Sequence, residues 1–299
     1  MRFLIYGAGV IGSLYAARLS EAGYETTLYA RGDRLAALQK DGLLYENRGQ
    51  IRRANVTITD HVGHNDRYDF ILLPVRENQV HKALEELREN TSLTIVTMVN
   101  TLEPYREWET LCGEGRLLPA FPGAGGGFEN GMLHASLTPR FIQPTVFGEL
   151  DGRKTERLMT LQTVFKKAGI PCEIIEDMHS WQLCHLAMVV PLADAYYETE
   201  SPETVWREKR VMRLTAERIR QNVRTLHALG IRITPAKMQF FRFLPLAVFS
   251  AGLKRVYQSK FGNTFMYRHA VKAPDEMRRL HDQFYSYLQT ACNGKATGG

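Results

Sequence analysis

Continuous apolar runs alternate with helically spaced apolar positions through the first half of the chain. The runs are RFLIY at the start, YDFILLPV at 68–75, LTIVTMV at 93–99 and LLPAF at 117–121, and their lengths are typical of strands buried on both faces. Residues 77–90, between two of these runs, carry apolar positions at helical spacing. Strands that alternate with helices predict an α/β fold with a doubly wound parallel sheet.

The pattern changes twice further along the chain. Residues 131–149 are short, β-rich and broken by turns, which predicts strands added at one side of the sheet. An amphipathic helix (TERLMTLQTVFKKAG) and a last strand (PCEIIED) follow, and then only helical patterns remain, at 178–198, 203–229, 236–257 and 273–291. We therefore expect an α/β domain over 1–174, an all-helical domain over 175–293 and a disordered tail over 294–299.

Composition narrows the class of protein. Of the 299 residues 44% are hydrophobic and 23% are charged, as is ordinary for a globular protein. The net charge of +6 suits an anionic ligand, but the basic residues form no dense run, which argues against nucleic-acid binding. The four cysteines lie far apart without zinc-ligand spacing, so we expect no metal and a reducing cytoplasm. We expect no signal peptide and no membrane span, because the chain starts with a strand and its longest apolar run, 186–193, is short.

A glycine motif follows the first apolar run. It stands between a strand pattern and a helix pattern, and it reads Gly7, Ala8, Gly9, Val10, Ile11 and Gly12. In this setting the first glycine permits a tight turn, the second lets a pyrophosphate approach the backbone, and the third lets helix and strand pack closely. The motif predicts a Rossmann-type domain whose helix N-terminus binds a dinucleotide. The alternative is a glycine-rich turn in an α/β protein that binds no nucleotide.

The β-branched and aromatic stretch TTLYA (26–30) predicts the second strand, and the residues at its end indicate which dinucleotide binds. An acid there would favour NAD, but the sequence is YARGDR, with Arg31 at the strand tip and Arg34 one turn later. An arginine at this place accommodates the 2′-phosphate of NADP, so we predict NADP as the cofactor. Asp33 is a competing acid, although it is also suited to cap the next helix. The alternative for Arg31 is a solvated surface arginine.

With these residues, the chain resembles the ketopantoate reductase (2-dehydropantoate 2-reductase) family. The likeness is carried by IYGAGVIGSLYAARLSEAG, YARGDR, VRENQV, MVNTLEP, VFGELDGR and EDMHSWQL. The resemblance implies reduction of an α-keto acid by NADPH. It also implies that Arg76 takes the place of a lysine near the nicotinamide, and that Asn100 is the asparagine of the substrate and cofactor cleft.

The resemblance breaks down where the family carries its proton donor. It implies a lysine and two asparagines at four-residue spacing in the first helix of the second domain, and these positions hold Gln182, Leu186 and Val190. Glutamine donates a hydrogen bond but supplies no proton at neutral pH. His185 shares a helix face with Gln182 and has the pKa range of a general acid, so Gln182, His185 and Asn100 are the candidate catalytic residues. The alternative for His185 is a buried histidine that only packs in the core.

These observations predict an NADPH-dependent oxidoreductase acting on a small, anionic keto compound. Two alternatives stay open: a non-catalytic NADP-binding sensor, and an authentic ketopantoate reductase with relocated catalytic groups. The apolar segment FFRFLPLAVFSAGL suits either the helical core or a homodimer interface.

Two further segments have open roles. The glycine-rich residues 121–131 are either a mobile loop over the ligand crevice or a plain connection. Arg268, His269, Lys272 and Glu276 form either a carboxylate-binding cluster or the solvated face of a helix.

Overall fold

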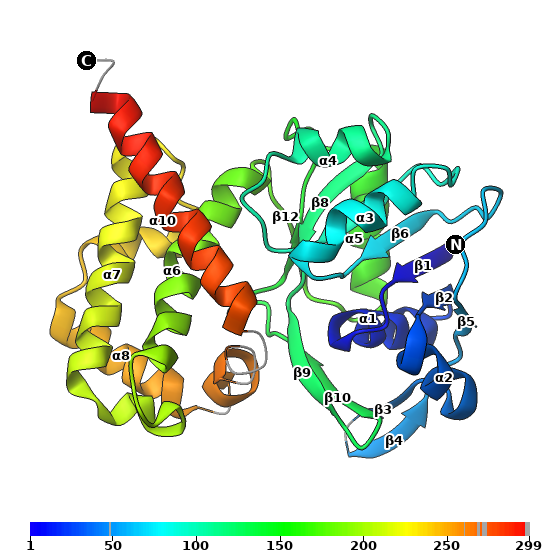
Figure 1. Cartoon of the computed structure of the whole chain (residues 1–299), viewed down its shortest axis with the longest axis horizontal. Helices are drawn as coiled ribbons and strands as arrows, with labels where there is room; N and C mark the ends of the chain where they lie inside the picture. Colours follow the sequence, from blue (N-terminus) through cyan, green and yellow to red (C-terminus); the bar gives the residue numbers. More distant parts are fainter. Residues whose placement is uncertain (48, 260, 268–269, 271–273, 297–299) are drawn as a thin grey trace. The chain divides into compact units, whose positions relative to one another are not determined.

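The computed structural model describes residues 1–47, 49–259, 261–267, 270 and 274–296. The chain divides into two compact units, Met1–Met178 and His179–Gly299 (Figure 1). The division follows residue 178, whereas the sequence pattern predicted it after residue 174. Each unit is described separately below.

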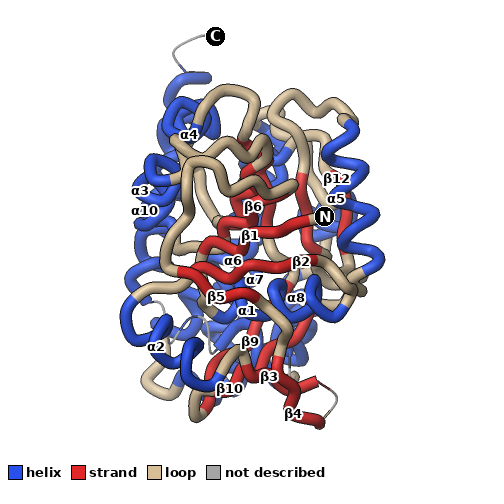
Figure 2. The backbone as a smooth tube through the Cα atoms, turned by 90° about the vertical axis from the view of Figure 1, so that its right-hand side faces the viewer, coloured by secondary structure: helices blue, strands red, loops and turns tan. Residues whose placement is uncertain are grey.

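The first unit is built on an eight-stranded sheet, in the order β12-β11-β8-β7-β6-β1-β2-β5. Its strands are β1 (Arg2–Tyr6), β2 (Glu25–Tyr29), β5 (Thr57–Thr59), β6 (Phe70–Leu73), β7 (Ile95–Met98), β8 (Leu117–Phe121), β11 (Thr145–Phe147) and β12 (Cys172–Ile174). All neighbours pair in parallel except β8 and β11. Figure 2 shows β6, β1, β2 and β5 side by side in this order. The predicted doubly wound α/β sheet is therefore confirmed.

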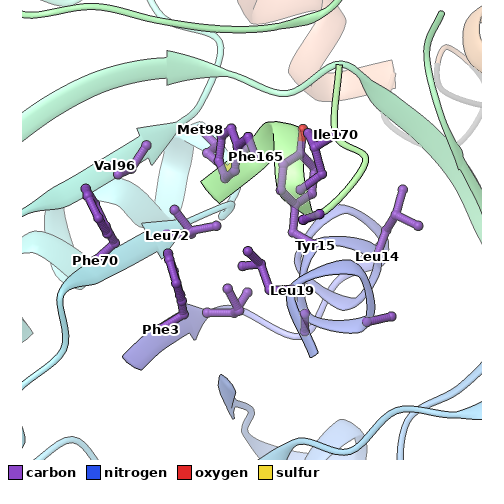
Figure 3. Packing of buried hydrophobic residues seen from close by; sticks show 14 of the residues in the cluster. Phe3, Leu14, Tyr15, Leu19, Phe70, Leu72, Val96, Met98, Phe165 and Ile170 are labelled. Atoms are coloured by element: carbon purple, nitrogen blue, oxygen red, sulfur yellow. The ribbon is translucent and has the colours of Figure 1, made fainter. Parts of the chain in front are cut away.

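Both faces of this sheet are covered by helices. The helices of the first unit are α1 (Val10–Glu21), α2 (Gly32–Asp41), α3 (Val80–Glu86), α4 (Tyr105–Cys112) and α5 (Glu156–Lys167), with a 3-10 turn η1 (Glu77–Gln79) before α3. Phe3 and Ile5 of β1 pack with α1 and α5 in one hydrophobic cluster, part of which Figure 3 shows. Leu4 and Tyr6 point to the opposite face and pack with α3 and α4. Strands buried on both faces explain why the sequence shows continuous apolar runs instead of alternation.

A second, four-stranded sheet has the order β4-β3-β10-β9. Its strands are β3 (Leu44–Asn47), β4 (Gln50–Arg53), β9 (Ala124–Glu129) and β10 (Met132–Leu137). Two expectations need correction here. Residues 121–131 are no loop, because six residues of β9 pair antiparallel with β10. The strands within 131–149 do not all join the main sheet, because β10 belongs to the second sheet and only β11 extends the first.

The described part of the second unit contains helices only. After α6 (Met178–Tyr197), which begins at the unit boundary, come η2 (Pro202–Arg207), α7 (Lys209–Ala228), η3 (Ala236–Arg242), α8 (Leu246–Gln258), the π-helical turn η4 (Gly262–Tyr267) and α10 (Pro274–Ala296). The last helix continues to Ala296, so residues 294–296 of the predicted tail are helical, and 297–299 lie outside the described residues. None of the helices within the described ranges has the length and apolar character needed to span a bilayer.

Candidate active site

Four of the predicted ligand-binding positions follow the ends of four adjacent strands. Gly7 follows β1, Arg31 closely follows β2, Arg76 follows β6 and Asn100 follows β7, and these strands are neighbours in the order β7-β6-β1-β2. Because the strands are parallel, the four positions lie at one edge of the sheet. The chain order reverses at β1, which has β2 on one side and β6 on the other. Ligands of open α/β sheets bind at this kind of switch point.

The three glycines of the turn have different surroundings. Gly7 has φ +136°, a conformation that side-chain-bearing residues rarely adopt. A Cβ atom at Gly12 would lie 1.9 Å from the carbonyl oxygen of Gly7, so helix and turn pack too closely for any side chain. Gly9 has φ −71° and ψ −173°, and a Cβ atom there would meet no described atom within 4 Å. Packing therefore explains the glycine at position 12 but leaves the one at position 9 unexplained.

The glycine turn ends at the N-terminus of α1. The backbone N–H of Ser13 donates to the carbonyl of Gly9 at 2.9 Å, which opens the intrahelical ladder. The N–H groups of the preceding first-turn residues, Val10 and Ile11 among them, have no acceptor within the helix. Such N–H groups and the helix dipole favour an anion at this end. Val10 and Ile11 turn their half-buried side chains toward the core, and the buried Ala8 offers its carbonyl oxygen to the Ser13 hydroxyl at 3.2 Å.

Arg31 is held by three side chains. Its Nε donates to the Tyr29 hydroxyl, one Nη donates to the Tyr6 hydroxyl at 2.9 Å, and the same nitrogen forms an ion pair with Glu86. The rings of Tyr6 and Tyr29 stack at 4.2 Å between centroids, and the guanidinium lies over Tyr29. Burial would raise the pKa of Glu86, but hydrogen bonds from Tyr6 and Arg31 outweigh it and keep the pKa below its usual value. The carboxylate is therefore ionised near neutral pH. The sequence analysis did not identify Glu86 as a partner of Arg31, because the two residues lie 55 positions apart.

Arg34 is bound to the glycine turn itself. Its Nε donates to the Ala8 carbonyl at 3.1 Å, its Nη2 donates to the Ser13 hydroxyl at 3.3 Å, and the guanidinium lies 4.1 Å from the ring centre of Phe128 in β9. The second sheet thus braces the arginine that supports the turn. Asp33, the competing acid, does not cap α2 as predicted, because Arg31 is the N-cap residue and no side chain caps this helix; Asp33 lies in its first turn, where a negative charge is favourable.

Arg76 and Asn100 present polar groups at the sheet edge. Arg76 is exposed, and its guanidinium makes no salt bridge with a described carboxylate. Asn100 is half-buried, and within the described part of the chain its buried Oδ1 accepts no hydrogen bond. A buried amide oxygen without a donor is costly, so this atom suits a ligand that brings a donor.

The candidate catalytic residues of the helical unit are deeply buried. Gln182 is fully buried, as are Leu186 and Val190 at the positions where the resemblance implies asparagines. His185 is 7% exposed, and its ring stacks on Trp181 with centroids 4.9 Å apart. The structure thus brings His185 together with Trp181, an arrangement that suits the core-packing alternative for this histidine.

A histidine that the sequence analysis missed lies in α10, another helix of the same unit, and contacts α6. Asp194, one turn beyond Val190, accepts from the Nδ1 of His281 in α10 at 3.0 Å to both carboxylate oxygens. Burial raises the pKa of Asp194, and the charge of His281 opposes that rise. The His281 ring also packs on Tyr285, and its side chain is 40% exposed. No protein partner for its Nε2 exists among the described residues, so this nitrogen is available.

Two other expectations concern chemistry outside these clusters. Of the proposed carboxylate-binding cluster, Arg268, His269 and Lys272 lie outside the described residues. Within the described ranges, no group of three or more His, Cys, Asp or Glu side chains is arranged to hold a metal ion.

Comparison with known families shows a family match for this chain. The family model described as "Ketopantoate reductase PanE/ApbA" matches residues 3–152. The chain is 26% identical to the uncharacterized oxidoreductase YkpB of Bacillus subtilis over 184 residues. This alignment covers 60% of this chain and 58% of that protein. It is 27% identical over 204 residues to 2-dehydropantoate 2-reductase of Mesorhizobium japonicum, covering 60% of this chain and 61% of that protein. The chain thus spans about three fifths of the length of these curated relatives.

Solved structures share the fold over nearly the whole chain. The 2-dehydropantoate 2-reductase of Geobacter metallireducens GS-15 superimposes with a TM-score of 0.68 at 18% identity, covering 97% of this chain and 100% of that one. A D-mandelate dehydrogenase, solved with NADH and anilino(oxo)acetate, gives a TM-score of 0.65 at 15% identity, covering 99% of this chain and 98% of that one. At these identities the likeness establishes the fold.

Proposed function

Because the chain belongs to the ketopantoate reductase PanE/ApbA family, we propose that it is an oxidoreductase that uses NADPH to reduce the carbonyl group of a small, anionic keto compound. The observation that carries the proposal is the space at Gly9. Neither backbone strain nor packing requires a glycine there, and the helix N-terminus beside it favours an anion. Close approach of a pyrophosphate is a physical reason for this glycine.

The residues at the sheet edge fit a dinucleotide. Residues 7–12 would hold the pyrophosphate, and Arg31 would face the 2′-phosphate of the adenosine. Arg76 would add positive charge further along the cofactor, and the Asn100 amide oxygen would accept a hydrogen bond from cofactor or substrate. When bound, the dinucleotide supplies the hydride for the reduction.

The reduction also needs a proton donor. Gln182 and His185 are the sequence-based candidates; the first supplies only a hydrogen bond, and the second is stacked in the core. His281 satisfies the requirements of a general acid better, because Asp194 fixes its Nδ1 and its half-exposed ring leaves Nε2 available. We infer that His281 donates the proton and that Asp194 positions it.

A first experiment tests the function as a whole. NADPH consumption is measured with 2-dehydropantoate, pyruvate, 2-oxoisovalerate and phenylglyoxylate, which share a 2-keto acid group and differ in bulk. We expect turnover with at least one of them. Tight NADPH binding without turnover of any 2-keto acid would contradict the proposal and favour a non-catalytic sensor.

Arg31→Ala provides the matched test of cofactor choice. The variant should weaken NADPH binding by about 1.5–3 kcal/mol, the value of a hydrogen bond to a charged group, and leave NADH binding nearly unchanged. Equal losses for both dinucleotides would show that Arg31 acts by holding Tyr6 and Tyr29 in place.

We also propose that the protein is a homodimer. Phe240 and Phe243 of the apolar segment are 70% and 72% exposed, which suits a protein interface better than a core. Light scattering tests this proposal by measuring the molar mass of the wild type and of the double variant Phe240→Ser/Phe243→Ser in solution. A monomeric wild type would contradict it.

A further inference from the structure

The arginine proposed to bind the 2′-phosphate already has a negatively charged partner. Glu86, the last residue of α3, forms an ion pair with Arg31, and Arg31 is half exposed while Glu86 is one-third exposed. The same carboxylate accepts from the hydroxyl of Tyr6. Arg31 therefore has an acid from a distant part of the chain at the place where an anionic group of the cofactor would bind.

The stacked tyrosines hold this arrangement in one position. Tyr6 donates to Glu86 and accepts from Arg31, so it joins the two charged groups. Burial, followed by its contact with Glu86, raises the pKa of Tyr6, so the hydroxyl stays protonated and remains a donor. The guanidinium also lies over the Tyr29 ring. Arg31 is thus directed toward α3 by contacts on three sides.

Arg34 is not free to replace Arg31. Its hydrogen bonds go to the Ala8 carbonyl and the Ser13 hydroxyl of the glycine turn, and one face of its guanidinium is covered by Phe128. Turning it outward would remove the support of the turn that the pyrophosphate needs. Recognition of a 2′-phosphate therefore rests on Arg31.

We propose that Glu86 is a specificity-determining residue that competes with the 2′-phosphate for Arg31 and thereby limits the preference for NADPH over NADH. The inference rests on the proposed function. A 2′-phosphate has to open the Arg31–Glu86 pair or share one guanidinium with a carboxylate, and both cost binding free energy through lost contact or like-charge repulsion. NADH carries only a hydroxyl at this position, so its binding leaves the pair closed.

The test measures dissociation constants for NADPH and NADH by the fluorescence of the reduced nicotinamide at low ionic strength, where exposed charges are least screened. The variant is Glu86→Gln, which removes the charge and keeps an acceptor for Tyr6. The matched control is Glu85→Gln, an exposed carboxylate one residue earlier on the same helix. Thermal denaturation of each variant confirms that it is folded.

We expect Glu86→Gln to tighten NADPH binding by about three- to tenfold, because the variant removes both the exposed Arg31–Glu86 ion pair and the repulsion between the carboxylate and the 2′-phosphate. NADH binding should change less than about twofold. Glu85→Gln should leave the ratio of the two constants unchanged. The effect of Glu86→Gln should vanish in an Arg31→Ala background, because the guanidinium for which the carboxylate and the 2′-phosphate compete is then absent.

Two results would overturn the inference alone. One is an unchanged NADPH-to-NADH ratio in Glu86→Gln, and the other is weaker NADPH binding, which would mean that Glu86 holds Arg31 ready for the phosphate. If neither dinucleotide binds to the wild type or to any variant, the proposed function fails first, and the inference fails with it.

Discussion

The glycine turn allows two neighbouring substitutions with opposite consequences. Gly12→Ala places a Cβ atom 1.9 Å from the Gly7 carbonyl oxygen and 3.0 Å from Cγ of Pro74. Helix propensity alone would favour alanine over glycine within a helix by about 1 kcal/mol. The overlap with a backbone atom outweighs this gain. Inserting atoms into a packed site typically costs about 1–3 kcal/mol, and a backbone atom is displaced less easily than the end of a side chain. Because a contact of 1.9 Å with a backbone atom places the cost at the upper end of this range, we expect Gly12→Ala to lower the free energy of unfolding by about 2 kcal/mol after the propensity gain is subtracted.

Gly9→Val should leave the fold intact and remove the binding site. The backbone of Gly9 is extended, a conformation open to valine, and no described atom lies within 4 Å of the added Cβ. The unfolding free energy should thus change by less than about 1 kcal/mol, the usual range at a helix N-cap. The side chain would occupy the space of the pyrophosphate and block its bonds to backbone N–H groups. Two such bonds at about 1.5 kcal/mol each correspond to roughly a hundredfold loss of affinity.

Urea denaturation and fluorescence titration with NADPH separate the two effects. The expected pattern is a stable Gly9→Val whose NADPH affinity is lower by roughly a hundredfold, beside a Gly12→Ala that loses stability. Wild-type NADPH affinity in Gly9→Val would refute the assignment of the pyrophosphate to this turn. Wild-type stability in Gly12→Ala would refute the steric argument.

Two predictions concern the helical unit. Wild type should reduce 2-dehydropantoate at least about a hundredfold more slowly than a relative with the lysine, measured as NADPH consumption. Gln182→Lys should restore little activity, because an amine buried beside Leu186 would lose its proton and the substrate would stay unpositioned. Rapid turnover by wild type would contradict this reasoning. His281→Asn should slow turnover of the best 2-keto acid by about a hundredfold or more. His179→Asn, which alters another imidazole between α6 and α10, should leave the rate unchanged. Wild-type turnover by His281→Asn would exclude His281 as the donor.

The strands of the main sheet were predictable because burial leaves a direct trace in the sequence. LLPAF was predicted over 117–121, and β8 spans these residues. The strands β3, β4 and β5 were missed, since they lie at edges or in the small sheet; all four residues of β4 are exposed and carry no apolar pattern. Sequence periodicity reports burial, so a strand without buried residues gives no signal.

Residues 121–131 were misread because glycine was taken as a sign of flexibility. Gly126 has φ +152°, and a Cβ atom there would lie 2.2 Å from the carbonyl oxygen of His134 in the paired strand. Close approach of the two strands therefore requires this glycine. In a strand, glycine also marks places where another backbone comes close, and composition alone does not separate that case from a loop.

The sequence predicted that the second unit is helical, but it did not predict where two of its helices are interrupted. The helix expected over 203–229 is divided at Glu208, whose backbone is extended, and the one expected over 236–257 is divided before α8 at Pro245. The second break had a signal in the sequence, because proline interrupts a helix at or before the preceding residue. The first had none, since Glu208 is an ordinary helix-forming residue.

The proposed proton donor, His281, could not be found from the pattern of α6 alone. Positions 182, 186, 190 and 194 are four residues apart and share one face of α6, and the resemblance implies polar groups at the first three. Those three are buried here, and a carboxyl group stands one turn later, at Asp194. Asp194 gains a chemical role only through His281, 87 residues away, and no motif connects the two. Loss of a lysine in the sequence suggests loss of catalysis. We propose that the His281 imidazole, held at Nδ1 by the Asp194 carboxylate, takes over the proton donation that a lysine would otherwise perform.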